Sequence, residues 1–504
     1  VVTVIQRQRV PLLHTLGVAG SNGEETDETR LPAPEHPLLM PLNEVQLAEL
    51  IERHIEYYDL KSDKPVHLAG SFVTHYLKRD DDALPTVFAV ATMPMVLPDG
   101  TILSGHGLDR RTGVVFRVPR ELEDLLPRQE DCTATAVAQA MRFLTDEWLC
   151  DVATDYQGKS ILVAMTATIL ERLLLAERPA FFITAGQRGG GKTTVVSMIS
   201  MAALGARPAA AAWSPNEEER RKTLFAYLLS GIPLLMWDNI PRGAALSCPS
   251  IEKALTTAQY ADRVLCESKT RNVNATAVMG FTGNNIAPRG DLASRSLIAR
   301  LSVDRPDPEN RPFKHANPIS WTEAHRGQIL AALYTILLGN PRLRPAFNVP
   351  PAETRFKDWW HLVGAAVEYA AAQHVEHVLA LTLDPHPTCG PTTISFKKLF
   401  LVGESEEEQS SSLATVLDLI RTKWPYGCQA AALAAYAGEA AEGAIEFKAS
   451  LEAASGKAIK VVTPRVITWV LKALIDAPVQ VGDAVLALRY SPANQGGTFA
   501  VRQV

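Results

Sequence analysis

Residues 186–193 follow the pattern GxxxxGK[ST], in which a lysine and a threonine come directly after the last glycine. Glycines let successive backbone N–H groups turn towards one anion, and a lysine adds a mobile positive charge. The pattern predicts that the loop binds the β- and γ-phosphates of ATP, with Thr193 as a ligand of Mg²⁺. The predicted phosphate-binding residues are Gly186, Gln187, Arg188, Gly189, Gly190, Gly191, Lys192, Thr193 and Thr194.

Two later apolar runs end in polar side chains. Residues 232–237 lead into Asp238, and residues 277–282 lead towards Asn284. An aspartate after such a strand can accept a hydrogen bond from magnesium-bound water, so we expect Asp238 at the metal. The amide of Asn284 can donate to the γ-phosphate and accept from the attacking water, although an Asx turn is the alternative.

The general base for hydrolysis is not evident, because Asn239 stands where many ATPases of this layout place a glutamate. An amide cannot act as a base. Either Asn239 orients the water, or a carboxylate comes from the segment after the neighbouring strand. There we expect Ser214 as the N-cap and Glu217 as the acid of a capping box, which makes Glu218 the candidate base.

Basic residues after these motifs suggest two further roles. Arg295 is predicted to reach the γ-phosphate of a neighbouring subunit, and Arg300 is the alternative residue for this role. For either arginine, a surface salt bridge without a catalytic role is the other possibility. Between the strand that ends at Asp238 and the strand that leads to Asn284, here called the sensor strand, residues 263–274 form two extended runs with a basic tip. Lys269 and Arg271 are predicted to hold DNA phosphates there, and a hairpin without a ligand is the alternative.

The elements around these motifs predict an α/β P-loop NTPase with a parallel sheet. Its apolar strands are 180–184, 209–213, 232–237 and 275–282, and its helices include 134–149, 159–176 and 194–203. A helix from Asn43 and strands within 88–118 predict an N-terminal α/β module. The acidic, serine-rich run 404–412 is interpreted as a loop.

The C-terminal segment has the pattern of a winged helix. Thr463 is the expected cap of a helix that runs to Ile475, and strands are expected at 484–490 and 498–504. Arg465 and Lys472 on this helix are predicted to touch DNA phosphates, although such domains also pack against proteins.

These assignments divide the chain into five parts: a linker at 1–42, the N-terminal module at 43–155, the ATPase domain at 156–340, a helical extension and linker at 341–412, and the winged-helix-like domain at 413–504. A length of 504 residues is enough for about three domains.

Composition restricts the function classes. The chain has 47% hydrophobic and 21% charged residues and a net charge of −5, which excludes a uniformly basic nucleic-acid coat. No run is long and apolar enough to cross a membrane, and no signal peptide is evident. The six cysteines lack a CxxC spacing, which predicts reduced thiols and a cytoplasmic location. The set His374, His377, His386 and Cys389 has zinc-ligand types, although packed or solvated histidines are the alternative.

The motifs GQRGGGKT, LLMWDN, FTGNN and DLASR, in this order, resemble those of the AAA+ helicases of superfamily III. The resemblance is to the helicase portion of phage and mobile-element primase–helicases, and it covers roughly residues 45–375. It implies a homo-oligomeric ring of about six subunits that hydrolyses ATP with Mg²⁺ in a bacterial or phage-infected cell. Single-stranded and forked DNA are the implied substrates, with a primase domain or subunit on the N-terminal side. The alternative function is an ATP-dependent DNA-binding switch, such as an origin-recognition or loader protein.

Overall fold

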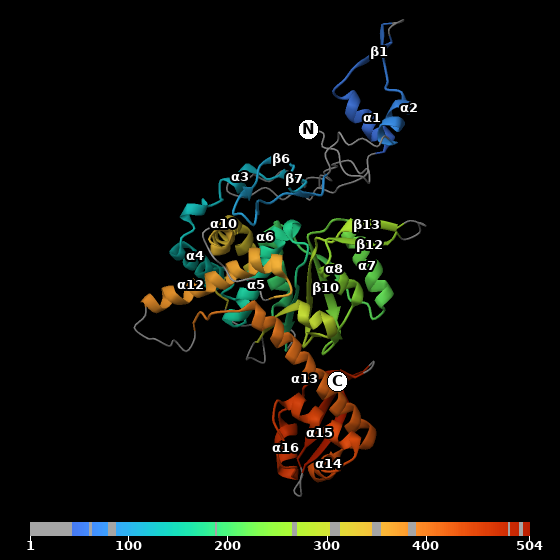
Figure 1. The fold of residues 1–504 in the computed structure, drawn as a ribbon, viewed down its shortest axis with the longest axis vertical. Coiled ribbons are helices and arrows are strands. Elements are labelled where there is room, and N and C mark those ends of the chain that lie inside the picture. Colours follow the sequence, from blue (N-terminus) through green and yellow to red (C-terminus); the bar gives the residue numbers. More distant parts are fainter. Residues whose placement is uncertain are drawn as a thin grey trace.

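The computed structural model describes most of the chain and resolves three parts in a row, with a small N-terminal part, a large central body and a C-terminal unit (Figure 1). The described residues are 43–59, 63–78, 87–186, 189–264, 270–302, 313–344, 354–381, 390–481, 484–492 and 497–504, with backbone only for Leu381, 402–408 and Gln480. None of the described helices is long and apolar enough to cross a membrane.

The central body is built on a parallel sheet of five strands within the described residues, in the order β16-β8-β14-β10-β9. The strands are β8 Ala180–Ala185, β9 Ala209–Ala212, β10 Leu234–Ile240, β14 Val278–Asn284 and β16 Ser296–Leu301. The prediction of an α/β fold with a parallel sheet is therefore confirmed. The strand order puts β14 between β8 and β10, so two strands distant in sequence flank the sensor strand.

Helices cover both faces of this sheet, because alternate strand residues point to opposite sides. Phe181 and Ile183 belong to the core shared with α4, α5, α6, α10 and α12, whereas Phe182 belongs to the core shared with α7 and α8. These helices are α4 Ala134–Arg142, α5 Tyr156–Glu171, α6 Lys192–Leu204, α7 Glu217–Leu229, α8 Pro249–Leu255, α10 Arg326–Leu338 and α12 Ala365–Leu381. The predicted helix 134–149 continues beyond α4 as the π-helical turns Phe143–Trp148.

The N-terminal module combines short helices with small sheets. As predicted, Asn43 caps the first helix, and Gln46 completes a capping box with it. The elements are α1 Glu44–Glu52, β1 Tyr57–Asp59, β2 Lys64–Val66, α2 Gly70–Lys78, β3 Ala89–Ala91, β4 Met95–Val96, β5 Ile102–Leu103, β6 His106–Asp109, β7 Val114–Arg117 and α3 Arg120–Glu123. The strands between 88 and 118 are thus confirmed.

A buried carboxyl joins this module to the central body. The N–H of Val96 in β4 donates to both oxygens of Glu171 at the end of α5, each at 3.1 Å. The Glu171 side chain is fully buried, and this burial raises its pKa well above the usual value. Burial therefore favours the neutral form of Glu171, while the hydrogen bond from Val96 opposes that shift.

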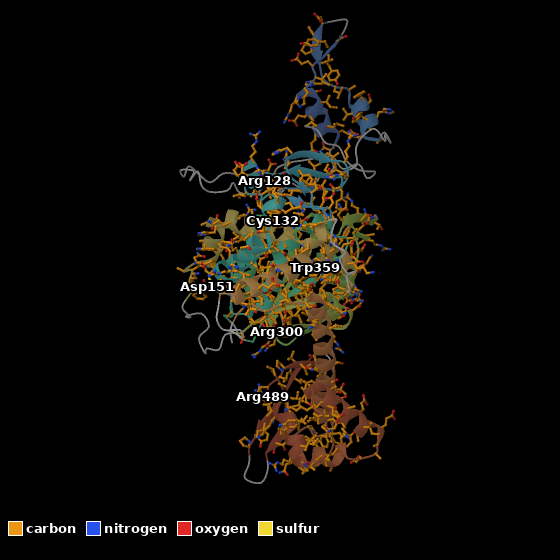
Figure 2. The ribbon with its side chains drawn as sticks, turned by 60° about the vertical axis from the view of Figure 1, so that its left-hand side comes forward. Arg128, Cys132, Asp151, Arg300, Trp359 and Arg489 are labelled. Atoms are coloured by element: carbon orange, nitrogen blue, oxygen red, sulfur yellow. The ribbon has the colours of Figure 1, made fainter. Side chains whose placement is uncertain are left out.

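Smaller elements surround the sheet. The remaining described ones before residue 360 are β11 Ala245–Leu246, β12 Gln259–Arg263, β13 Thr270–Asn274, β15 Ala287–Pro288, α9 Pro318–Ala324, α11 Lys357–Trp359 and the 3₁₀ turns η1 Gln129–Asp131, η3 Arg172–Leu174, η4 Gly290–Arg295 and η6 Pro341–Leu343. Trp359 is buried in the central body (Figure 2), where its ring nitrogen donates to Thr168 at 2.8 Å.

The expected loop at 404–412 is wrong. These residues lie inside α13, which runs without a break over Phe396–Lys423. Glutamate and glutamine are good helix formers, and the four serines of this run cost only a few tenths of a kcal/mol each, about 1–2 kcal/mol together. The two ends of α13 also pack in different cores, with Phe396 and Phe400 in the central body and Leu413 and Ile420 in the C-terminal unit. Packing at both ends therefore stabilises the helix across the polar run.

The C-terminal unit packs three short helices on an antiparallel sheet in the order β17-β20-β19-β18. Its elements are β17 Cys428–Gln429, α14 Ala430–Ala437, α15 Glu442–Ser455, α16 Pro464–Lys472, β18 Val479–Val481, β19 Ala484–Ser491 and β20 Thr498–Gln503. The Thr463 side chain accepts from the Val466 N–H, so the predicted cap and helix start are confirmed, as are the two strands, while the helix ends at Lys472 and not at Ile475. The proposed domain boundaries remain predictions.

The thiols of Cys132, Cys150, Cys248 and Cys428 are free among the described residues, while Cys266 and Cys389 lie outside them.

Candidate functional site

The glycine-rich loop connects β8 to α6, where sequence analysis put it. Gly189 and Gly191 have φ angles of +76° and +83°, a left-handed backbone that side chains with a Cβ rarely adopt. Gly191 is the N-cap of α6, so the open N–H groups of the first helical turn face the loop. An anion could bind there without any further donor. The predicted Gln187 and Arg188 lie outside the described residues.

Lys192 is hydrogen-bonded to Asn284, the residue predicted to contact the γ-phosphate. Its ammonium donates to Oδ1 of Asn284 at 2.6 Å. The strand order explains this contact, because Asn284 ends β14 in register with Ala185, the last residue of β8. Partial burial lowers the pKa of Lys192, and the charge of Asp238 opposes that shift. The amide nitrogen of Asn284 remains a donor on the same side of the sheet.

Asp238 is positioned by a residue that the sequence analysis did not assign. The Thr282 hydroxyl donates to Oδ1 of Asp238 at 2.7 Å. Thr282 lies two residues before Asn284 in β14, so both side chains point to one face, towards Asp238 and Lys192 respectively. The sequence did offer a signal for this role, because Thr282 is a polar residue in an otherwise apolar strand and lies two positions before Asn284. The structure thus brings Lys192, Asn284, Asp238 and Thr282 together.

Asn239 has a backbone reason for being an asparagine. Its φ angle is +56°, and the register between β10 and β14 shifts at this point. Asparagine tolerates the left-handed region much better than glutamate does. Its side chain is exposed. The irregular, left-handed backbone at position 239 therefore explains why asparagine stands there and not glutamate.

The start of α7 differs from the prediction. Asn216, and not Ser214, is the N-cap, and the helix begins at Glu217. The Asn216 side chain accepts from the Glu218 N–H at 2.8 Å, so the helix starts two residues later than a cap at Ser214 would place it. Glu218 itself is exposed and forms an ion pair with Lys222 at 3.1 Å. The segment that leads from β9 into α7 starts beside Asp238, because the Trp213 N–H donates to the Asp238 carbonyl at 2.9 Å.

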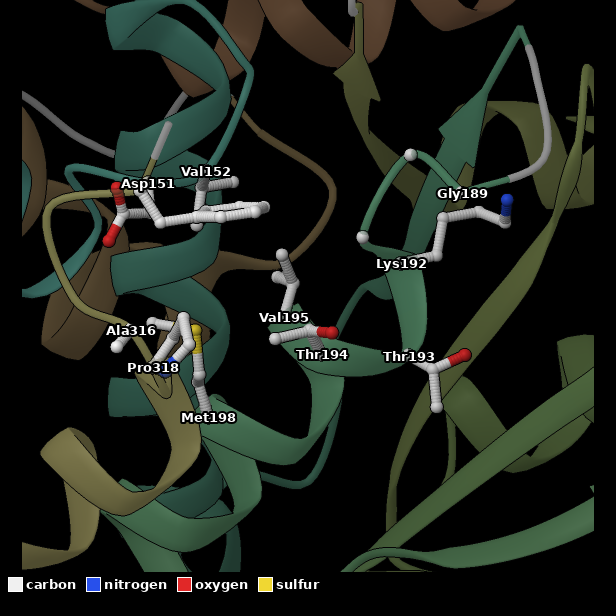
Figure 3. A pocket seen from close by; sticks show the side chains of 13 residues that line it. Asp151, Val152, Gly189, Lys192, Thr193, Thr194, Val195, Met198, Ala316 and Pro318 are labelled. Carbon is white, nitrogen blue, oxygen red and sulfur yellow. The ribbon is translucent and has the colours of Figure 1, made fainter. Parts of the chain in front are cut away.

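A cleft of about 400 Å³ adjoins the loop and the first two turns of α6. Figure 3 shows Lys192 and Thr193 on one side of the helix start, with Val195 and Met198 facing a wall that includes Val152 and Pro318. The cleft therefore has a cationic end and an apolar end, which suits a phosphate chain joined to a planar ring.

Residues outside every sequence motif build the apolar wall. Oδ1 and Oδ2 of Asp151 accept from the backbone N–H groups of Lys314 and His315 at 2.6 and 2.9 Å. This clamp holds residues 313–318 against Val152, although they are more than 150 positions apart. No local pattern marks either segment as part of a site.

Arg295 is engaged within its own chain. Its guanidinium donates to the Glu252 carbonyl at 2.6 Å and pairs with Asp291, and only 15% of its side chain is exposed. The structure also packs α13 against η4, which carries Arg295. Arg300 is exposed on the edge strand β16, at the lower border of the central body (Figure 2).

The predicted DNA contacts that the structure describes belong to two elements, the β12–β13 hairpin and α16. β12 and β13 form the expected hairpin, in which Arg271 is in register with Asp262. Lys269 lies outside the described residues. Arg465 and Lys472 are both exposed on α16 in the C-terminal unit.

The candidate zinc residues are only partly described. His374 is buried, and its Nδ1 is 3.0 Å from the Tyr156 hydroxyl. Burial lowers the pKa of this histidine. His386 and Cys389 lie outside the described residues. The contact with Tyr156 favours the packed-histidine reading.

Comparison with known proteins gives only distant likeness. A scan against protein-family models finds no match, and a search of curated proteins finds none. Among solved structures, the chain is similar to the apo A form of the NrS-1 C-terminal region, with 12% identity, coverage of 92% of this chain and 100% of that one, and a TM-score of 0.35. It is also similar to JCV helicase, with 12% identity, coverage of 52% and 72%, and a TM-score of 0.23. Likeness at this level assigns no role to any residue.

Proposed function

We propose that the chain is an ATP-dependent DNA helicase. The observation that carries the proposal is the polar cluster beside the glycine-rich loop, in which Lys192 contacts Asn284 at 2.6 Å and Thr282 contacts Asp238 at 2.7 Å. A cation, a carboxylate and an amide at the carboxyl edge of a parallel sheet are the groups that phosphoryl transfer to water requires.

Each residue has a distinct part in this scheme. Lys192 and the N–H groups at the start of α6 bind the terminal phosphates and stabilise the charge that develops there. Thr193 and Asp238 are the residues that would hold Mg²⁺, which would neutralise phosphate charge there. Asn284 positions the attacking water by hydrogen bonding. Glu218 is the proposed proton acceptor, and its ion pair with Lys222 must then open.

The apolar end of the cleft receives the nucleobase. Val152, Val195 and Met198 line this end of the cleft and provide apolar contact. The cleft lies against the loop itself, so a base there and phosphates at Lys192 belong to one ligand.

Steady-state kinetics and strand displacement test the proposal together. With ATP and Mg²⁺, the protein should hydrolyse ATP faster when single-stranded DNA is added and should release the labelled strand of a tailed duplex. An absence of hydrolysis under all conditions contradicts the proposal.

A DNA-binding switch is the second candidate, and the exposed amide of Asn239 at the usual base position favours it. The two functions differ in one result. A switch binds ATP and changes its affinity for DNA, yet it leaves the tailed duplex intact.

Assembly into a ring, with a hexamer as the expected form, belongs to the same proposal. Arg295, the first choice for this role, is mostly buried in its own chain, whereas its alternative Arg300 is exposed, so the test uses Arg300. Mixing Lys192→Ala with Arg300→Ala protein should restore part of the activity by forming intact mixed interfaces. Arg295→Ala should instead lower stability, since it removes the bond to Glu252. No recovery at any mixing ratio would argue for sites completed within one chain.

A further inference from the structure

The outer face of α16 combines an aromatic ring with positive charge. The helix buries Ile467, Val470 and Leu471 in the core of the C-terminal unit. Arg465, Trp469 and Lys472 follow one another at spacings of four and three residues, so they share the opposite face. All three are exposed. In Figure 1, α16 lies on the outer side of the unit, away from the central sheet.

This face belongs to a stretch without any acidic residue. From Gly456 to Ile475 the sequence has four basic residues, Lys457, Lys460, Arg465 and Lys472, and no aspartate or glutamate. The whole chain carries a net charge of −5. A local charge of +4 on a chain of opposite sign is the arrangement that selects an anionic polymer at one place.

Trp469 is the unusual member of the group. It is 56% exposed, although burying a tryptophan is among the largest apolar gains available to a fold. The Lys457 ammonium lies 3.9 Å from the centre of its ring. The cation therefore covers part of one face of the indole, while more than half of the residue stays exposed.

We propose that this face binds single-stranded DNA, with an unpaired base stacked on Trp469 and the flanking phosphates at Arg465 and Lys472. Unpaired bases present the π-face that an exposed indole needs, whereas bases in a duplex are already stacked on each other. The positive charges on both sides of the ring match a backbone that carries one phosphate per base. The choice of DNA as the polymer rests on the proposed function.

Binding of the full chain to three matched oligonucleotides tests the inference. The probes are a fluorescent oligothymidine, an abasic strand with the same number of phosphates, and a duplex of the same length. Trp469→Ala should weaken binding of oligothymidine about 5- to 100-fold and leave binding of the abasic strand unchanged, because only stacking is lost. Trp469→Phe should keep most of the affinity.

Tyr426→Ala is the matched control, since Tyr426 is an aromatic residue of the same unit that is 92% exposed before β17. It should bind all three probes like the wild type, and circular dichroism and Tm should show that each variant folds.

Three outcomes overturn the inference. The first is a Trp469→Ala variant that binds oligothymidine with wild-type affinity. The second is a variant that loses as much affinity for the abasic strand as for oligothymidine. The third is a variant that loses only duplex binding or only self-association. Hydrolysis of ATP is measured on the same samples. A wild-type protein that binds DNA through Trp469 without hydrolysing ATP contradicts the proposed function alone.

Discussion

Two regions of this protein use polar residues in opposite ways. At the carboxyl edge of the central sheet, Lys192 and Asp238 are partly buried, and each has a fixed hydrogen-bonding partner. On α16, Arg465 and Lys472 are exposed beside an open indole. In a preorganised site a single side chain contributes much of the catalytic effect, whereas on an exposed cationic face several side chains each contribute a small part of the binding free energy. Substitutions should therefore have large and specific effects in the first region and small and additive effects in the second.

The largest effect is expected for Lys192→Ala. The substitution removes the one cation that the Asn284 amide holds beside the loop, so ATP hydrolysis should fall at least 10²- to 10³-fold. Steady-state phosphate release measures it. Lys448→Ala on α15 is a control that should retain full activity. A Lys192→Ala variant with wild-type turnover would show that the cluster is only structural.

A smaller effect is expected for Thr282→Val, which keeps the shape of the side chain and removes its hydrogen bond to Asp238. A hydrogen bond to a charged group contributes about 1.5–3 kcal/mol, so the apparent affinity for Mg²⁺ should fall roughly 10- to 100-fold. Titration of hydrolysis with Mg²⁺ measures it. Thr282→Ser should restore the affinity, and an unchanged Mg²⁺ titration for Thr282→Val would exclude this positioning role.

On the exposed face, Arg465→Ala and Lys472→Ala together should weaken single-strand binding by modest, additive steps. The salt dependence of binding should also decrease by about 0.7 per charge removed. The double variant of Lys269 and Arg271 is the direct comparison, because it tests the hairpin as the main DNA contact. If only the hairpin variant changes the salt dependence, α16 is not a phosphate site.

The smallest effect concerns burial without a charged partner. Because burial raises the pKa of Glu171, its contribution to stability is complete below the usual glutamate pKa and is lost as the pH rises towards its pKa in the folded protein. Glu171→Gln removes this dependence. Its Tm should exceed that of the wild type by a few degrees at pH 8, with a smaller difference at pH 5. The exposed Glu446→Gln should melt like the wild type at both values, and parallel pH curves for Glu171→Gln would contradict the prediction.

The sequence by itself determined the local features. The loop glycines, the caps Asn43 and Thr463, and the apolar strands of the sheet all appear where their patterns predicted them. Each depends on backbone geometry or on burial within a few residues, so short patterns carry the information. The wrong loop at 404–412 shows the limit of this reasoning, since packing at the two ends of α13 decided the helix.

Only the tertiary structure decided which of these features meet. The strand order brings Asn284 to Lys192 and Thr282 to Asp238, and the clamp at Asp151 adds an apolar wall that no motif marks. It also decided that Arg295 contacts Glu252 in its own chain. Such contacts depend on the order of strands and on packing between distant segments, and neither is encoded in the spacing of neighbouring residues.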